Sequence, residues 1–144
     1  MNIDLGELNY IDKDQLYTPL ETVEYCYSIL SNIFKKYIEN IYNYDFIEPS
    51  TGSGNFIKIL LKHNHQNIIA MDIEPKGANI LINDYLDWKP LSNLKNYIVF
   101  GNPPFGLRGQ LALQFINHSS SFADFVAFIL PQLFISDGFL VKEF

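Results

Sequence analysis

The sequence of 144 residues predicts an α/β protein built on a doubly wound parallel sheet. Three observations predict this fold class. Short, almost wholly apolar segments recur along the chain, segments of helical periodicity separate them, and glycine, proline and asparagine mark the turns. Apolar strands that alternate with helices are typical of a parallel sheet covered on both faces. The length indicates a single domain over residues 1–144.

The first predicted element is a long helix that starts at Thr18-Pro19-Leu20-Glu21. Thr18 would be the N-cap, Pro19 would take the first helical position, and Glu21 follows the cap by three residues. Asn43 and Tyr44 are expected to end the helix. Its apolar stripe, with spacings of three and four, consists of Val23, Tyr27, Leu30, Phe34, Ile38 and Ile41.

Short strands and helices alternate along the rest of the chain. Strands are predicted at 45–48, 67–71, 80–82, 97–100 and 125–130. Helices are predicted at 55–62 and 110–118.

Composition and charge narrow the class of protein. No apolar run is long enough for a bilayer, and the N-terminus lacks the features of a secretory signal, so a soluble cytoplasmic protein without a membrane partner is expected. The single cysteine, Cys26, excludes an internal disulfide framework, and no metal site is expected. The formal net charge of −6 argues against a uniformly basic nucleic-acid-binding surface. A DNA partner would require a local basic patch or positive charge from a second polypeptide.

A glycine-containing loop, Glu48-Pro49-Ser50-Thr51-Gly52-Ser53-Gly54-Asn55-Phe56, follows the first predicted strand. Ligands of open parallel sheets bind at the carboxyl ends of strands, where glycines allow the backbone close approach. A dinucleotide fingerprint would need glycine where Ile57 stands, and a phosphate loop would need lysine in place of Asn55. The alternative is a simple strand-to-helix turn.

Asp72 strengthens the ligand interpretation because it ends the second strand 20 residues after Gly52. This is the usual offset of a carboxylate that accepts hydrogen bonds from ribose hydroxyls, although Asp72 could also be an ordinary capping residue. A site for an adenosine without a pyrophosphate suggests S-adenosyl-L-methionine as cofactor.

The sequence Asn102-Pro103-Pro104-Phe105 follows the fourth predicted strand. Two prolines lock an extended turn, which is expected to present the Asn102 amide and the Pro103 carbonyl outward as acceptors. Phe105 would stack on a base removed from its helix. Such a loop suits methylation of an amine on a planar ring; the alternative is a proline-rich loop without a ligand.

Together these segments resemble the class I S-adenosylmethionine-dependent amino-methyltransferases, particularly DNA adenine-N6 methyltransferases of the restriction-modification and phage type. The resemblance spans about residues 15–135, and the motif order is similar to the gamma arrangement of that family. It rests on Tyr17-Thr18-Pro19, the Glu48–Phe56 loop, Asp72-Ile73-Glu74-Pro75, Asn83-Asp84-Tyr85-Leu86 and Asn102-Pro103-Pro104-Phe105. It implies a Rossmann-like fold and methyl transfer to N6 of adenine in DNA.

The resemblance also implies a role for each matching residue. Asp72 would hold the ribose, with Glu74 as second candidate, and Ile73 would pack on the adenine ring. Asp84 would accept a hydrogen bond from the amino group of the cofactor's adenine, and Tyr85 would lie beside Asp84. The residues implied for the methionine part and the adjoining loop are Tyr17, Thr18, Glu48, Ser50, Gly52, Gly54 and Phe56. The residues implied for catalysis and for holding the target base are Asn102, Pro103, Pro104 and Phe105, with Asn102 also beside the cofactor.

Relative to that family, strands six and seven and a target-recognition region are expected to be missing, which suggests a partial domain. A second polypeptide could then supply recognition and the missing strands. Alternative substrates are an RNA adenine and the side-chain amide of a protein glutamine. A further alternative is a truncated, cofactor-binding half without independent activity.

Overall fold

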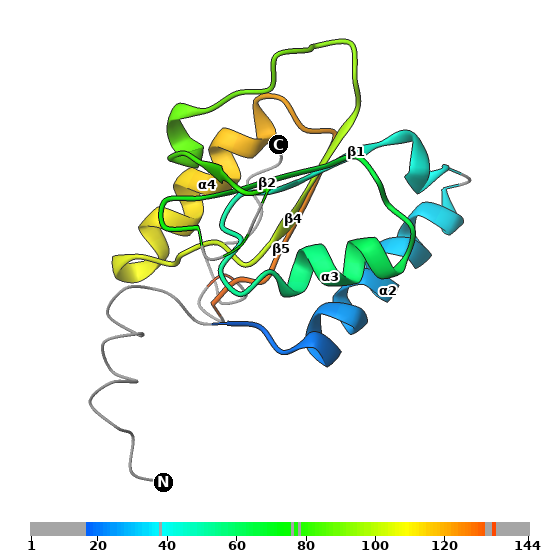
Figure 1. Ribbon diagram of the computed structural model, residues 1–144, viewed down its shortest axis with the longest axis horizontal. Coiled ribbons are helices and arrows are strands. Elements are labelled where there is room, and N and C mark those ends of the chain that lie inside the picture. Colours follow the sequence, from blue (N-terminus) through cyan, green and yellow to red (C-terminus); the bar gives the residue numbers. More distant parts are fainter. Residues whose placement is uncertain (1–16, 38, 76, 78, 132–133, 135–144) are drawn as a thin grey trace, which may run out of the picture.

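The computed structural model describes residues 17–37, 39–75, 77, 79–131 and 134. Its centre is one sheet, with helices packed on both faces (Figure 1). The fifth predicted strand lies within the described part, whereas the chain at 1–16 and 135–144 lies outside it.

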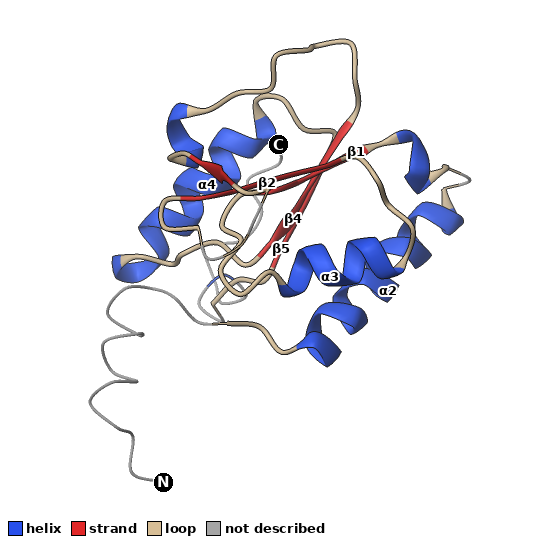
Figure 2. Ribbon diagram, viewed as in Figure 1, coloured by secondary structure: helices blue, strands red, loops and turns tan. Residues whose placement is uncertain are grey.

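All five strands of the sheet are parallel, as the sequence predicts (Figure 2). They run in the spatial order β3-β2-β1-β4-β5. Their bounds are β1 Asp45–Glu48, β2 Ile68–Asp72, β3 Leu81–Ile82, β4 Tyr97–Gly101 and β5 Phe125–Phe128. The α/β class with a parallel sheet is therefore confirmed.

Among the described residues, three α-helices cover the sheet. Helices α2 (Leu20–Lys36) and α3 (Asn55–Lys62) lie on one face, and α4 (Gln110–Ser120) lies on the other (Figure 1). The described part of the chain also has short 3-10 helices that the sequence did not predict, among them η1 (Ile41–Asn43), η2 (Tyr85–Asp87) and η3 (Leu107–Gly109). No helix in the part of the chain seen here is long and apolar enough to span a membrane.

The start of α2 corrects one prediction. Pro19, not Thr18, is the residue that caps the helix, with an extended backbone (φ −58°, ψ 148°) and no side-chain capping bond. The first turn begins at Leu20. The hydroxyl of Thr18 instead accepts a hydrogen bond from a residue 84 positions away, Asn102. A tertiary partner has replaced the local cap that the sequence suggested.

The end of α2 corrects a second prediction. The helix stops at Lys36, well before Asn43, and Ile41 belongs to the separate helix η1. The Asn40 side chain caps η1 by accepting from the Tyr42 amide at 3.0 Å. This turn lets the chain reverse into β1 while Ile41 still reaches the same core as α2. The predicted stripe residue Ile38 lies outside the described residues.

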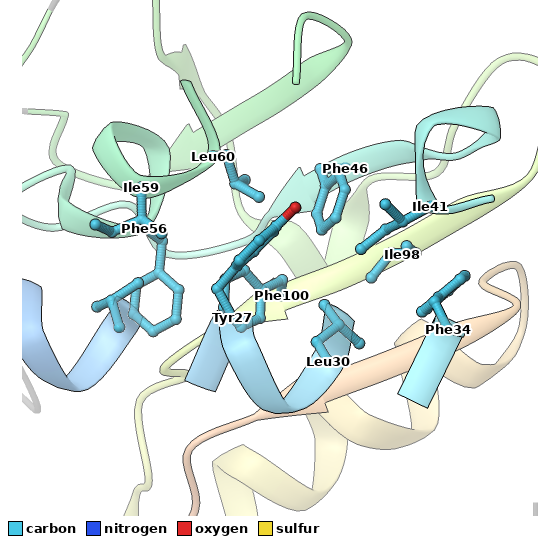
Figure 3. Packing of buried hydrophobic residues seen from close by; sticks show 11 residues of the cluster. Tyr27, Leu30, Phe34, Ile41, Phe46, Phe56, Ile59, Leu60, Ile98 and Phe100 are labelled. Carbon is cyan, nitrogen blue, oxygen red and sulfur yellow. The ribbon is translucent and has the colours of Figure 1, made fainter. Parts of the chain in front are cut away.

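The two sides of the central strands form two separate cores. One unites α2 and α3 with β1 and β4, and Figure 3 shows the side chains of both helices pointing toward Phe46, Ile98 and Phe100. The other unites α4 and η2 with the opposite side chains of the same strands, such as Ile47 and Val99. Successive strand residues point to opposite faces, so an unbroken apolar run serves both cores.

Strand order determines where a ligand can approach. From β1 the chain crosses to β2 on one side and later to β4 on the other, so β1 and β4 flank the switch point of the sheet. The loops that leave β1, β2 and β4 therefore emerge next to one another. These are the loops that begin after Glu48, Asp72 and Gly101.

Candidate functional site

The loop after β1 has the tight conformation that its glycines predict. Gly52 and Gly54 have positive φ values of 54° and 84°, a region that other residues rarely adopt. A Cβ on Gly54 would meet nothing within 4 Å, so the backbone there faces open space at the start of α3. At Gly52 the Tyr17 ring occupies the space where a side chain would begin, because an ideal Cβ on Gly52 would lie 3.0 Å from Cε1 of that ring.

Asp72 is bonded directly to this loop. Its Oδ2 accepts from the amide of Gly52 at 2.8 Å, and its Oδ1 accepts from the amide of Glu74 at 3.0 Å. Gly52 and Asp72, which lie 20 positions apart in the sequence, are thus in direct contact, and their hydrogen bond joins the loop to the end of β2. A carboxylate offers about four acceptor positions, so Asp72 retains capacity for further donors such as hydroxyl groups.

Glu48 is a completely buried carboxyl group beneath the site. Its Oε1 accepts from the Ser50 amide at 2.9 Å, whereas its Oε2 has no hydrogen-bond partner among the residues described. Burial raises the pKa of Glu48 well above its ordinary value; the Ser50 amide opposes this shift and the Asp72 carboxylate adds to it. An orphan buried acceptor of this kind is costly unless a proton or a cation compensates it.

Three segments meet at Asn102, which follows β4. Ser50 donates from its hydroxyl to the Asn102 carbonyl at 3.0 Å. The Asn102 side-chain nitrogen donates to the Thr18 hydroxyl at 3.1 Å, and the Asn55 side-chain nitrogen donates to the Thr18 carbonyl at 2.7 Å. The N-terminal segment, the β1 loop and the β4 loop are therefore joined by side-chain hydrogen bonds.

The diproline turn is fixed from its far end as well. The Phe105 carbonyl accepts from the amides of Leu111 and Ala112 in the first turn of α4. Gly106 has φ 69°, and a Cβ there would lie 2.6 Å from Cβ of Leu111. Pro104 and Phe105 are partly exposed, and so is Asn102.

One expectation about this turn is wrong. Pro103 was expected to present its carbonyl outward, but it is buried. It follows Gly101 and Asn102 directly, where the turn lies under the Glu48–Ser50 segment. The second acceptor expected on the turn, the side-chain oxygen of Asn102, is also buried, although the residue as a whole is partly exposed.

Two residues predicted to touch the cofactor have their side chains in the core instead. Tyr85 is 1% exposed, and its hydroxyl forms a 2.6 Å hydrogen bond with that of Ser119 in α4. Phe56 is buried with its ring centroid 4.9 Å from that of Phe100. Both side chains are apolar enough to be recruited by the two cores, so we correct their predicted role from ligand contact to support of the loops.

The remaining predicted residues lie at the surface near strand ends. Ile73 is 68% exposed directly after β2, which suits an apolar contact with a flat ring. Asp84 is exposed and caps η2 by accepting from the Leu86 amide at 3.0 Å. Glu74 is exposed as well. Among the described residues, no cluster of three metal-ligating side chains occurs.

A cavity of about 510 Å³ lies elsewhere, between α2, the segment 39–42 and His63. This is the end of the sheet where β1 and β2 begin, opposite the carboxyl ends that carry the predicted residues. Its two acids are already engaged, since Glu24 contacts Lys62 and His63, and Glu39 accepts from Tyr44. We take the carboxyl-end cluster as the candidate site because its loops follow the rule for open parallel sheets.

Two residues of the site were missed in the sequence. Asn55 was considered only as a substitute for a phosphate-loop lysine, yet it bonds the Thr18 segment to α3. Gly101 has no role in the sequence prediction, yet a Cβ there would lie 2.5 Å from Oε1 of Glu48. Neither role has a local signal, because each partner is more than 35 positions away in the chain.

Comparison of the chain with protein-family models, with curated proteins and with solved structures finds no match.

Proposed function

We propose that this protein transfers a methyl group from S-adenosyl-L-methionine to the exocyclic N6 of adenine in DNA. The observation that carries the proposal is the convergence on Asn102. The Thr18 hydroxyl and the Ser50 hydroxyl both bond to Asn102, which joins the segments expected to bind cofactor to the segment expected to bind the amine.

The residues of the β1 loop fit a cationic cofactor. The Glu48 Oε2 atom is buried without a hydrogen-bond partner in the described structure, and the loop above it leaves open space at Gly54. A ligand that carries an ammonium and a sulfonium group would compensate the carboxylate. Asp72 would accept from the ribose hydroxyls, and the exposed Ile73 would contact the adenine.

When bound, the cofactor supplies an electrophilic methyl group. The contribution of this chain is to hold the accepting nitrogen in line with it. An exocyclic amine on an aromatic ring is a poor nucleophile because its lone pair is delocalised. The Asn102 side chain would accept from one N–H of that amine, and the partly exposed Phe105 would stack on the ring.

The substrate class rests on resemblance and on the N-terminal segment. Tyr17 lies against the glycine loop and Thr18 against Asn102, which is consistent with a role of this segment in the proposed site. The net charge of −6 gives little attraction to phosphate. Arg108, exposed in η3 directly after the diproline turn, is the cation best placed to meet a phosphate of the target strand.

The test is methyl transfer from radiolabelled S-adenosyl-L-methionine to duplex DNA, to RNA and to a protein extract in separate reactions. Label in adenine of DNA supports the proposal, and label only in RNA or in protein glutamine overturns its substrate. Saturable cofactor binding without label in any substrate would indicate a cofactor-binding chain that needs a second polypeptide for activity. Absence of cofactor binding overturns the proposal altogether.

Two substitutions separate the roles within the site. Asn102→Ala should abolish transfer while leaving cofactor affinity largely intact. Asp72→Ala removes an acceptor of two backbone bonds and of the ribose, so cofactor affinity should fall by about 10- to 100-fold. Asp87→Ala, at an exposed acid in η2, is the matched control and should change neither quantity. Full turnover by Asn102→Ala would refute the assigned role.

A further inference from the structure

The outer face of α2 carries a row of apolar side chains that neither core uses. Tyr25, Ile29 and Ile33 follow one another at intervals of four residues, and their exposed fractions are 66%, 45% and 41%. Tyr37, at the end of the helix, extends the row and is 65% exposed. Residues four apart on a helix are neighbours on its surface, so these four side chains form one continuous ridge, here called the α2 ridge.

The α2 ridge is a second apolar stripe on the helix. The first stripe packs against α3 and the sheet, and its buried residues are Val23, Tyr27, Leu30 and Phe34. In Figure 1, α2 lies at the periphery of the molecule. A helix on the surface of a single protein needs only one apolar stripe. A second stripe that is contiguous and exposed is typical of a surface that binds another protein.

The charges on α2 indicate which partner the ridge fits. Glu21 is exposed in the first turn of the helix, four residues before Tyr25. Lys36 is exposed in the last turn, three residues after Ile33. Neither Glu21 nor Lys36 forms an ion pair with another described residue. The ridge is therefore apolar along its length, acidic at one end and basic at the other.

A second copy of α2 that runs antiparallel complements this pattern. A two-fold axis near Ile29 brings the Ile29 side chains of the two copies together and places Tyr25 of each copy against Ile33 of the other. The same axis brings Glu21 of each copy to Lys36 of the other, so opposite charges meet at both ends. A parallel pair would instead place like charges side by side at each end.

We propose that this protein forms a symmetric dimer through the α2 ridge, with the two α2 helices packed antiparallel. One helix face is smaller than the roughly 800 Å² that each partner contributes to a standard interface, so the dimer should be reversible and depend on concentration. No residue of the ridge belongs to the candidate site. The inference therefore does not depend on the proposed function.

Sedimentation velocity of the full chain tests the dimer over concentrations of about 10 μM to 1 mM, the range in which weak interfaces associate. The unmodified protein should change from monomer to dimer as its concentration rises. Ile29→Lys should raise the dissociation constant by about tenfold or more, because it places two like charges at the axis. Leu91→Lys is the matched control, since Leu91 is a fully exposed apolar residue of the loop between η2 and β4, and it should dimerise normally.

Two outcomes of this experiment would overturn the proposal. One is a monomer throughout the concentration range, as expected if another part of the same chain covers the ridge. The other is an undiminished dimer in Ile29→Lys. Ile29 is exposed, so the variant should keep the circular dichroism spectrum of the unmodified protein.

Charge reversal tests the antiparallel arrangement without changing the apolar side chains. Glu21→Lys and Lys36→Glu each place like charges opposite one another at both ends of the dimer. Each should raise the dissociation constant by roughly 3- to 10-fold at low ionic strength. The double variant Glu21→Lys/Lys36→Glu restores the opposite pairs and should recover most of the affinity. A double variant that dimerises no better than either single variant would overturn the antiparallel pairing.

Disulfide cross-linking tests the position of the axis. In a Cys26→Ser background, Ile29→Cys places two thiols across the axis, where the Cα atoms of closely packed helices come within the roughly 4.4–6.8 Å that a disulfide requires. Leu91→Cys in the same background is the control. Ile29→Cys should oxidise to a covalent dimer faster than Leu91→Cys, and equal rates would overturn the proposal.

Discussion

The Glu48 carboxyl group occupies the space that a side chain on residue 101 would need. An ideal Cβ on Gly101 would lie 2.5 Å from Oε1 and 2.9 Å from Oε2 of Glu48. Both residues end neighbouring strands, β1 and β4, and both are buried. The acid that closes the glycine loop is therefore packed directly on the strand that delivers Asn102.

Gly101→Ala should destabilise the protein, because both the displaced carboxyl and the backbone around it are buried. Overpacking of this kind typically costs about 1–3 kcal/mol, measured as the free energy of unfolding in urea.

The double variant Glu48→Ala/Gly101→Ala provides the control. Removing the carboxyl opens the space for the new methyl group, so Gly101→Ala should cost less in the Glu48→Ala background than alone. Strictly additive free energies would show that the two residues do not contact each other in solution.

Glu48 should also make stability depend on pH. Its pKa is raised in the folded protein above the ordinary value of 4.5. Below pH 4.5 Glu48 is protonated in both the folded and the unfolded state. As the pH rises above 4.5, the unfolded chain ionises first, so the free energy of unfolding decreases until the pH reaches the pKa of Glu48 in the folded protein. The loss is measured as a difference between two proteins, because His65 contributes the opposite slope between pH 4 and 6.5: from pH 4 upward, the unfolding free energy of the cofactor-free protein should decline relative to that of Glu48→Gln. An equally steep profile in Glu48→Gln would contradict the prediction.

His65 predicts a loss of stability on the acid side. The side chain is 4% exposed and shares a 2.6 Å hydrogen bond with the Tyr27 hydroxyl, which joins the α3–β2 connection to α2. Burial, with the neighbouring His63, lowers the pKa of His65 from 6.5 to about 4. The unfolded state takes up the proton first as pH falls from 6.5 to 4, so about 2–3 kcal/mol should be lost in that window.

The double variant Tyr27→Phe/His65→Phe removes both partners of that bond and leaves no orphan hydroxyl. Its unfolding free energy should vary less between pH 6.5 and 4 than that of the unmodified protein. A profile that stays equally steep would place the acid sensitivity in other groups.

Tyr85→Phe tests the corrected role of Tyr85. The variant loses the hydrogen bond to Ser119, whose hydroxyl still donates to the Phe115 carbonyl. We expect a destabilisation of about 1 kcal/mol with unchanged affinity for S-adenosyl-L-methionine, determined by calorimetric titration. A specific loss of cofactor affinity at unchanged stability would restore the ligand role.

The regular elements were largely predictable because their signals are local. The bounds of β1 and α3 agree with the sequence prediction, and the ends of the other strands differ from it by at most two residues. The errors occur where a distant partner overrides a local preference. Thr18 bonds Asn102 instead of capping α2, and the chain leaves α2 at Lys36 because it must turn back into β1.

The residues of the candidate site were likewise predictable where their signals are local and unpredictable where they depend on distant partners. Gly52, Gly54, Asp72 and Asn102 could be identified from their spacing, since strand ends and positive φ values follow from short-range rules. The side chains that face the site could not be identified in this way. Tyr85, Phe56 and Pro103 are buried in the interior by packing partners far along the chain.

Periodicity and turn residues act over a few positions, and they were enough to predict that alternating apolar strands and helices form a parallel sheet with polar loops at its carboxyl edge. The hydrogen-bonded cluster of Thr18, Asn55, Ser50 and Asn102, and the packing of the Glu48 carboxyl against Gly101, became evident only in the folded protein. The physical reason is that these contacts join residues 37 to 84 positions apart, which become neighbours only when β1 and β4 pair.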